Sequence, residues 1–199
     1  MRKVVLATGN AGKLAEMRAI LAGRDLEVIP QGEFGITPPV EDGATFIANA
    51  LIKARHAAAH TGLPAIADDS GLEVDALGGR PGLHSARYAG PTAAVRDNNA
   101  LLLAELAGIP EGQRGARYRC AMVFVRDAAD LLPVITEAAW EGRIGREPRG
   151  LGGFGFDPLF IVEGDGRTAA EMSAEEKNRV SHRGQALLAL AARMREAGW

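Results

Sequence analysis

A short apolar strand turns directly into an amphipathic helix near the start of this sequence, and this order constrains the fold more than any other feature. Lys3–Ala7 is an apolar run typical of a buried strand. Leu14, Met17 and Leu21 then recur at the spacing of one helix face. The segment Thr8–Lys13 is therefore predicted to be a strand-to-helix turn, and a chain that goes on to mix the two element types favours an α/β fold.

The predicted turn carries the features of a phosphate cradle. Gly9 and Gly12 let the backbone come close to a ligand, the helix presents N–H groups and a positive dipole end, and Lys13 adds a full charge. The P-loop pattern is excluded, because it needs four residues between its glycines and a Ser or Thr after the lysine. A Gly-Asn turn that caps the helix beside a solvated lysine explains the same residues without a ligand.

Composition limits the classes of protein that this chain can belong to. The 199 residues are 47% hydrophobic, which suffices for a substantial core, and we expect a single domain over residues 1–199. The net charge of −2 gives no support for nucleic-acid binding. Cys120 is the only cysteine, which excludes an intrachain disulfide and a multi-cysteine metal site. No apolar run suits a signal peptide or a membrane span, so we expect a cytoplasmic protein.

Further strands and helices follow in mixed order. Leu26–Pro30 and Leu63–Ala67 have the strand pattern, and the segment Gln31–Gly43 between them is loop-like. Thr45 can cap a helix that runs to about His60. The later predictions are a helix from Thr92 through Leu106, strands at Arg117–Arg126 and Val134–Trp140, a capping box over Ser173–Glu176 and a terminal helix at Gln185–Arg195. The expected architecture is an α/β fold with a mixed sheet flanked by helices.

An acidic motif follows one of these strands. Asp68-Asp69-Ser70-Gly71 is expected in a strand-end loop, where adjacent carboxylates suit Mg²⁺, a hard cation that takes oxygen ligands. An Asx-type turn accounts for the same residues equally well. Glu41 and Asp42 in the upstream loop add further carboxylates. Together with the cradle, the acidic residues favour chemistry on phosphate, in which Mg²⁺ neutralises the phosphate oxygens.

Two segments in the second half of the chain suit a flat, anionic ligand. The glycine-rich run Gly150–Phe160 lets the backbone wrap a ligand, and Phe154 offers a stacking face, although Phe156 and Phe160 also fit a core cluster at a strand start. Lys177 and the run Asn178–Gly184 supply cations and a histidine for phosphate and base oxygens. A solvated connector between two helices is the alternative for this basic segment.

Six motifs, taken together and in this order, resemble those of the inosine/xanthosine triphosphate pyrophosphatase family. They are Thr8-Gly9-Asn10-x-x-Lys13, Ala67-Asp68-Asp69-Ser70-Gly71-Leu72, Leu77-Gly78-Gly79-x-Pro81-Gly82, Ser85-Ala86-Arg87-Tyr88, Gly152-Gly153-Phe154-Gly155-Phe156-Asp157-Pro158 and Ser181-His182-Arg183. The resemblance implies an elongated two-lobed α/β fold with the site between the lobes, and usually a homodimer. It also implies Mg²⁺-dependent hydrolysis of ITP, dITP and XTP to the monophosphate and pyrophosphate.

The same resemblance implies a role for each matching residue. Asp69 is the expected proton acceptor and a metal ligand, and Glu41 serves as the second ligand beside Val40, which stands where the family commonly has an acid. The helix motif that often reads Glu-Asn-Ala is Ala48-Asn49-Ala50 here. The expected phosphate contacts are Thr8, Gly9, Asn10, Ala11, Gly12, Lys13 and Lys53. Ser70 and Lys177 are expected to contact the nucleotide, Phe154, Gly155, Phe156 and Asp157 to frame the base, and His182 and Arg183 to contact the purine edge.

Two other functions stay open on the sequence. One is a related nucleotide pyrophosphatase with a different base preference, for example one that acts on modified pyrimidines. A non-catalytic nucleotide-binding regulator would keep the cradle but would not need Asp69.

Overall fold

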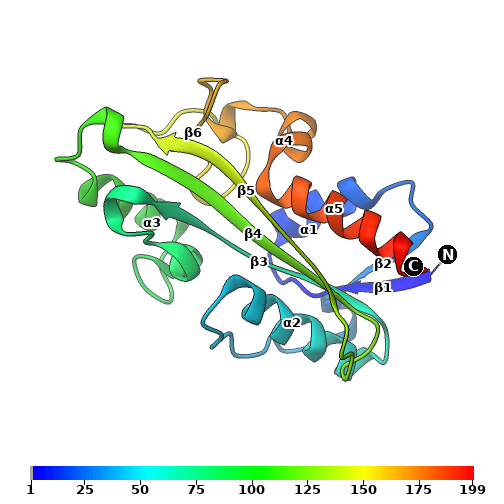
Figure 1. Cartoon of the computed structure of the whole chain (residues 1–199). Helices are drawn as coiled ribbons and strands as arrows, with labels where there is room; N and C mark the ends of the chain where they lie inside the picture. The colour runs from blue at the N-terminus through cyan, green and yellow to red at the C-terminus, as the bar shows by residue number, and fades with distance from the viewer. Residues whose placement is uncertain (1) are drawn as a thin grey trace. The chain divides into compact units, whose positions relative to one another are not determined.

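The computed structural model describes residues 2–199 and contains one mixed six-stranded sheet with the order β2-β1-β3-β4-β5-β6 (Figure 1). β1 is parallel to β2 and β3, and β5 is antiparallel to β6. The strands are β1 (Arg2–Leu6), β2 (Leu26–Pro30), β3 (Ala65–Val74), β4 (Gly115–Val125), β5 (Val134–Ile144) and β6 (Phe160–Val162). The α-helices are α1 (Ala11–Leu21), α2 (Phe46–Thr61), α3 (Val95–Glu105), α4 (Ala174–Val180) and α5 (His182–Glu196). The predicted α/β class with a mixed sheet is therefore confirmed.

The chain divides into two compact units. The first unit contains the described residues up to Asp69 together with Cys120–Ala138 and Arg183–Trp199, and the second contains Ser70–Arg119 and Ala139–His182. Each unit has its own hydrophobic core. That the whole chain acts as one domain stays a prediction.

In the first unit, helices cover both faces of the strands (Figure 1). Side chains of a strand alternate between the two faces, so Val4 packs in a cluster with residues of α1 and α5, whereas Val5 packs against α2. Apart from Asn49, the buried residues of α2 are alanines, which let the helix lie close to the sheet. The described helices include none that is long and apolar enough to cross a membrane.

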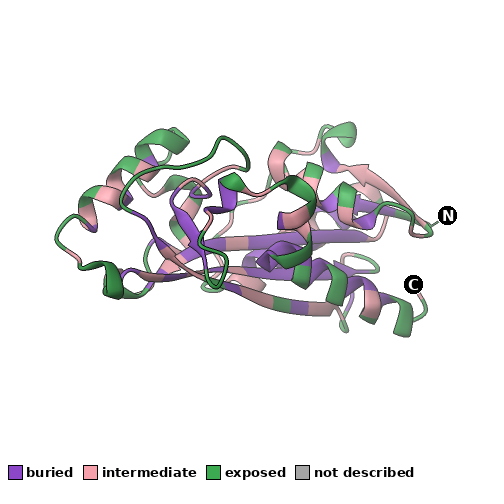
Figure 2. Cartoon of the chain, turned by 90° about the horizontal axis from the view of Figure 1, so that it is seen from above, coloured by how far each residue is buried: buried purple, intermediate pink, exposed green. Residues whose placement is uncertain are grey.

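In the second unit, a buried arginine joins two elements. Figure 2 shows that much of the sheet is buried. Arg114 is 2% exposed, and its hydrogen-bond partners include two residues of the core formed by α3 and by residues of β3 to β6. Its guanidinium donates hydrogen bonds to three backbone carbonyls: Nη1 to Leu106 O at 2.6 Å, Nε to Ile144 O at 2.8 Å and Nη2 to Gly145 O at 2.8 Å. The C-terminal end of α3 is thereby tied to the end of β5.

The prediction of a loop at the acidic motif is wrong. Asp68 and Asp69 lie inside β3, which continues to Val74. The strand continues because Leu72 and Val74 resume the apolar pattern and because the two carboxylates are paired with cations, which offsets the cost of burying them. The Asx-turn alternative is excluded by the same observation.

Several helix boundaries also differ from the sequence prediction. α3 begins at Val95 with Ala94 as its N-cap, not at Thr92, because Asp97 accepts a hydrogen bond from the Ala94 N–H at 3.2 Å. α5 begins at His182, three residues before the predicted Gln185. The Thr45 cap of α2 and the Ser173 capping box of α4 are confirmed.

Candidate functional site

The turn that follows β1 is held in shape by its own side chains. Asn10 caps α1 by accepting a hydrogen bond from the Lys13 N–H at 3.1 Å, and the Asn10 N–H donates to Thr8 Oγ1 at 3.2 Å. Gly9 and Ala11 are exposed, so the first turn of α1 faces solvent with N–H groups that have no partner inside the helix. The turn can therefore receive an anion without rearranging.

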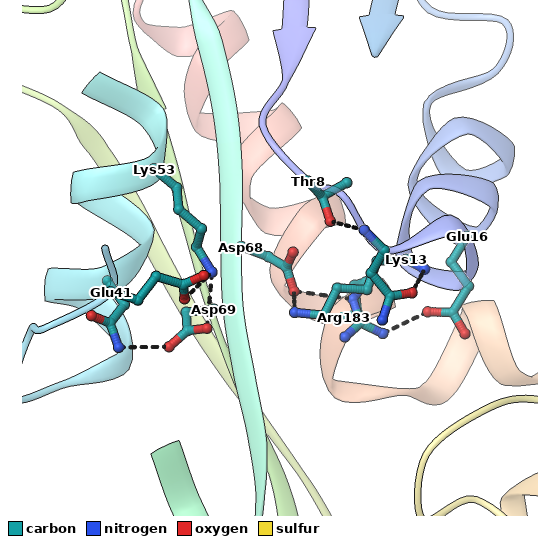
Figure 3. A network of polar contacts seen from close by, with 10 residues as sticks. Thr8, Lys13, Glu16, Glu41, Lys53, Asp68, Asp69 and Arg183 are labelled. Atoms are coloured by element: carbon teal, nitrogen blue, oxygen red, sulfur yellow. Dashed lines mark hydrogen bonds and ion pairs between the residues drawn. The ribbon is translucent and has the colours of Figure 1, made fainter. Parts of the chain in front are cut away.

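Beside this turn, a buried carboxylate joins two cations (Figure 3). Asp68 of β3 contacts Lys13 Nζ at 2.8 Å and Arg183 Nε at 3.3 Å, and Arg183 Nη1 donates to Glu16 at 2.6 Å. Burial acts to raise the pKa of Asp68, but Lys13 and Arg183 outweigh it and hold that pKa well below its usual range. Asp68 is therefore a fixed negative charge that links α1, β3 and α5.

The next residue of β3 points to a different set of partners. Asp69 Oδ1 accepts a hydrogen bond from Lys53 Nζ at 2.9 Å, and its Oδ2 accepts one from Asn49 Nδ2 at 3.2 Å. Lys53 also binds Glu41 at 2.9 Å, so one ammonium group joins both carboxylates (Figure 3). Burial raises the pKa of Asp69 although Lys53 acts to lower it. A carboxylate in this setting is a better proton acceptor than an exposed one.

Asp69 and Glu41 fit a divalent cation by the chemistry of their donor atoms. Both offer carboxylate oxygens, and both already converge on one positive group. Residues 2–199 contain no cluster of three or more His, Cys, Asp or Glu that could hold a metal ion. Mg²⁺ commonly takes one or two carboxylates and completes its shell with water and substrate phosphate. The pair therefore offers part of the coordination shell of a divalent cation.

A second group of polar and aromatic side chains lies in the second unit around Asp157. This buried carboxylate accepts hydrogen bonds from the Phe154 N–H at 2.8 Å, from Lys177 Nζ at 2.5 Å and from Tyr118 Oη at 3.1 Å. Lys177 Nζ also lies 4.6 Å from the centre of the Phe154 ring. The backbone turn needs Gly153, which has φ +68° and passes close to the Asp157 side chain. Asp157 therefore shapes the loop that presents Phe154.

The basic segment predicted from the sequence is partly buried and runs into the terminal helix. Lys177, Ser181, His182 and Arg183 are all less than 5% exposed, whereas Arg179 and Val180 between them are exposed, so the alternative of a solvated connector is wrong for the four buried residues and holds only for the two exposed ones. Lys177 lies in α4, whereas His182 and Arg183 form the first turn of α5. His182 stacks on the Tyr118 ring, with centroids 4.6 Å apart and planes 8° apart.

The structure places the predicted site residues in two groups, one in each unit. The first unit holds the turn, Lys53, Glu41, Asp69 and Arg183, and the second holds Ser70, Gly155, Phe156 and the Asp157 group. Two polar residues that join the first group were not among the predicted site residues: Glu16 and Asn49. Asp68, expected beside Asp69 as a carboxylate suited to Mg²⁺, is instead paired with Lys13 and Arg183. The spacing of Asn49 and Lys53, four residues apart on one side of a helix, could have indicated Asn49.

A sequence model of the Ham1 family matches residues 4–193. The chain belongs to the Ham1 family. Relatives in this family include the dITP/XTP pyrophosphatase of Methylococcus capsulatus, which is 61% identical over 98% of this chain and 96% of its own length. The dITP/XTP pyrophosphatase of Escherichia coli O157:H7 is 54% identical over 94% of this chain and 95% of its own length. Membership in the Ham1 family confirms the resemblance drawn from the six motifs.

Solved structures of Ham1 proteins share the fold. A HAM1 protein from Coxiella burnetii, 46% identical, superposes with a TM-score of 0.90 over 98% of this chain and all of its own. The Ham1 protein of Staphylococcus aureus, 34% identical, superposes with a TM-score of 0.86 over the same shares.

Proposed function

We propose that this chain hydrolyses dITP, ITP and XTP to the nucleoside monophosphate and pyrophosphate in the presence of Mg²⁺. The observation that carries the proposal is Asp69, a buried carboxylate of raised pKa that lies beside the cation of Lys53. The names of the Ham1 relatives, which are dITP/XTP pyrophosphatases, support the choice of substrate.

The turn after β1 binds the phosphates in this proposal. Its exposed N–H groups and the start of α1 attract negative charge, and Lys13 supplies a cation that Asp68 holds nearby at 2.8 Å. Lys53 adds a second cation next to Asp69. These groups stabilise the charge that moves onto the pyrophosphate leaving group.

Asp69 accepts the proton of the attacking water. Lys53 and Asn49 each donate to one of its oxygens and so fix the plane of the carboxylate. Asp69 and Glu41 would hold Mg²⁺ when it binds, and the ion would supply positive charge that offsets the phosphate oxygens. Direct attack by water needs no nucleophilic side chain, and the neighbouring Ser70 contacts the substrate.

The residues that the family resemblance assigns to the base select it in this proposal: the Phe154–Asp157 segment and His182 of the second unit, and Arg183 of the first. Phe154 provides the stacking face, and Lys177 Nζ lies 4.6 Å from the centre of its ring. The Phe156 side chain is 3% exposed in the core of the second unit, so Gly155, Phe156 and Asp157 would frame the base through their backbone.

His182 and Arg183 donate hydrogen bonds to the 6-oxo group of hypoxanthine and xanthine. The 6-amino group of adenine is itself a donor and cannot accept these hydrogen bonds. Arg183 is 2% exposed and is ion-paired with Asp68 and Glu16. To contact a base, its guanidinium must donate to the base while it keeps the ion pairs with these two carboxylates.

The test is pyrophosphate release from dITP, ITP, XTP, GTP, ATP and dUTP, each with Mg²⁺ and with a chelator. We expect the first three to be preferred over ATP by about tenfold or more, since one unpaired polar group in a closed site costs about 1–3 kcal/mol. Preference for dUTP would favour a pyrophosphatase with another base preference. Binding of dITP without Mg²⁺-dependent turnover would favour a non-catalytic regulator.

We also propose that the enzyme is a cytoplasmic homodimer and that its 199 residues act as one catalytic domain. The family resemblance supports the dimer. Light scattering of the purified protein measures its mass in solution, and a mass near 20.9 kDa would mean a monomer.

A further inference from the structure

We propose that Asn49 is the positioning residue for both carboxylates of the candidate metal site. The inference rests on the proposed function. Asn49 is 3% exposed, and its side-chain amide makes one hydrogen bond in each direction. Nδ2 donates to Asp69 Oδ2 at 3.2 Å, and Oδ1 accepts from the Gly43 N–H at 2.8 Å.

The hydrogen bond with Gly43 determines the orientation of the Asn49 amide and therefore which atom faces Asp69. A backbone N–H can only donate, so the atom of Asn49 that faces Gly43 must be the oxygen. The amide nitrogen then faces Asp69, which as a carboxylate can only accept. Because Lys53 donates to the other oxygen of Asp69, the carboxylate is held from both sides. An ionised aspartate, which has the same shape, offers acceptors only and could not donate to Asp69.

The bond to Gly43 fixes the segment that carries Glu41. A Cβ at Gly43 would lie 2.7 Å from Asn49 Oδ1, so only glycine allows the backbone to come this close to α2. Glu41, two residues earlier, is held by Lys53 at 2.9 Å. Asn49 and Lys53 are one helical turn apart. Two residues of α2, Asn49 and Lys53, therefore fix the position of the Glu41 carboxylate relative to that of Asp69.

The test replaces Asn49 by Leu, which keeps the shape and removes both hydrogen bonds, and by Ser, which is polar but too short to reach both partners. The same two substitutions at Asn98 are the matched control. Asn98 is 5% exposed and also accepts from one backbone N–H, that of Ala89, and donates to Ala86 O, but it makes no bond to Asp69. Mn²⁺ alone is the probe for binding, followed by the electron paramagnetic resonance signal of the free ion. Turnover of dITP is measured separately.

We expect Asn49→Leu and Asn49→Ser to weaken Mn²⁺ binding and to lower kcat by about 10- to 100-fold, the usual effect of removing a hydrogen bond to a metal-binding carboxylate. The KM for dITP should change by less than about threefold, because the phosphate turn is untouched. Asn98→Leu and Asn98→Ser should lower the Tm without either effect. If Asn49→Leu does not fold, the smaller serine side chain at the same position gives the comparison.

Two results overturn the inference. One is that the Asn49 variants match the Asn98 variants in Mn²⁺ affinity and kcat, which makes Asn49 a structural residue only. The other is a rise in KM with kcat unchanged, which places Asn49 in nucleotide binding. A wild-type protein that binds Mn²⁺ but does not turn over dITP contradicts the proposed function, and a loss of Mn²⁺ binding in the Asn49 variants then still supports the positioning role.

Discussion

Replacing Asp69 by asparagine separates its chemical role from its structural role. Two donors, Lys53 Nζ at 2.9 Å and Asn49 Nδ2 at 3.2 Å, converge on its two oxygens. The new amide has only one oxygen, which will face Lys53 because the ammonium cannot accept a hydrogen bond. Its NH₂ group then meets the NH₂ group of Asn49, donor against donor.

The structural cost of this change is smaller than the kinetic cost. Leaving a buried donor without an acceptor costs about 1–3 kcal/mol, and removing a buried charge offsets part of this. Loss of the proton acceptor lowers kcat by about 10²–10⁴-fold. At about 1.36 kcal/mol per tenfold, the barrier rises by about 3–5 kcal/mol. We therefore expect a folded protein, slightly less stable, that binds nucleotide and scarcely turns it over.

The assay combines kcat for pyrophosphate release from dITP with calorimetric binding of dITP and thermal unfolding. Asp130→Asn is the control, because Asp130 is also a buried carboxylate of the first unit but holds a turn through Arg126 and backbone N–H groups. It should lower the Tm and leave kcat unchanged. A folded Asp69→Asn protein with kcat within about tenfold of wild type would refute the role of Asp69 as proton acceptor.

Three further predictions address the phosphate turn, the base and the response to acid. Lys13→Ala, measured by calorimetry in the Asp69→Asn background, should weaken binding of ITP far more than binding of IMP, since the monophosphate makes fewer contacts with the turn; equal losses would place Lys13 outside a triphosphate site. Arg183→Lys keeps the charge but not the planar fork, so kcat/KM should fall more for ITP and XTP than for ATP, and an equal fall for all three would make Arg183 a structural or phosphate-binding residue. The side-chain hydrogen bond from Arg126 holds the pKa of Asp130 well below its unfolded value of about 3.9, so the stabilisation from this pair is fully present above that value and is lost as the pH falls through it toward the folded pKa. Denaturation in urea from pH 7 to pH 3 should accordingly show a shallower loss of stability in Asp130→Asn than in wild type, and parallel curves would contradict it.

Local patterns predicted those parts of the fold that depend on neighbouring residues. β1, the turn after it and α1 follow from apolar spacing over about twenty residues, and Asn10 caps α1 within the same segment. The caps at Thr45 and Ser173 are equally local. Such features need no knowledge of what packs against them.

The features that were missed depend on residues far apart in the sequence. The sequence predicted a loop at Asp68 and Asp69 because carboxylates are rare in a buried strand. The cations that pair with them belong to three different helices and are Lys13, Lys53 and Arg183. Nothing near the acidic motif in the sequence indicates these pairs. The roles of the individual site residues stay predictions for a different reason, because these roles depend on a nucleotide and a metal ion.

The buried guanidinium of Arg114 also bears on how the second unit opens in solution. Its three acceptors are carbonyls from the end of α3 and the end of β5. If one of these two elements moved away from the other, the guanidinium would lose hydrogen-bond acceptors while it is still buried, which costs free energy. Arginine cannot escape this cost by losing its proton, because it stays charged at any physiological pH. We therefore expect the backbone amides at the end of α3 and at the end of β5 to exchange hydrogen at the same rate, through one cooperative opening, although the two elements lie in separate parts of the sequence.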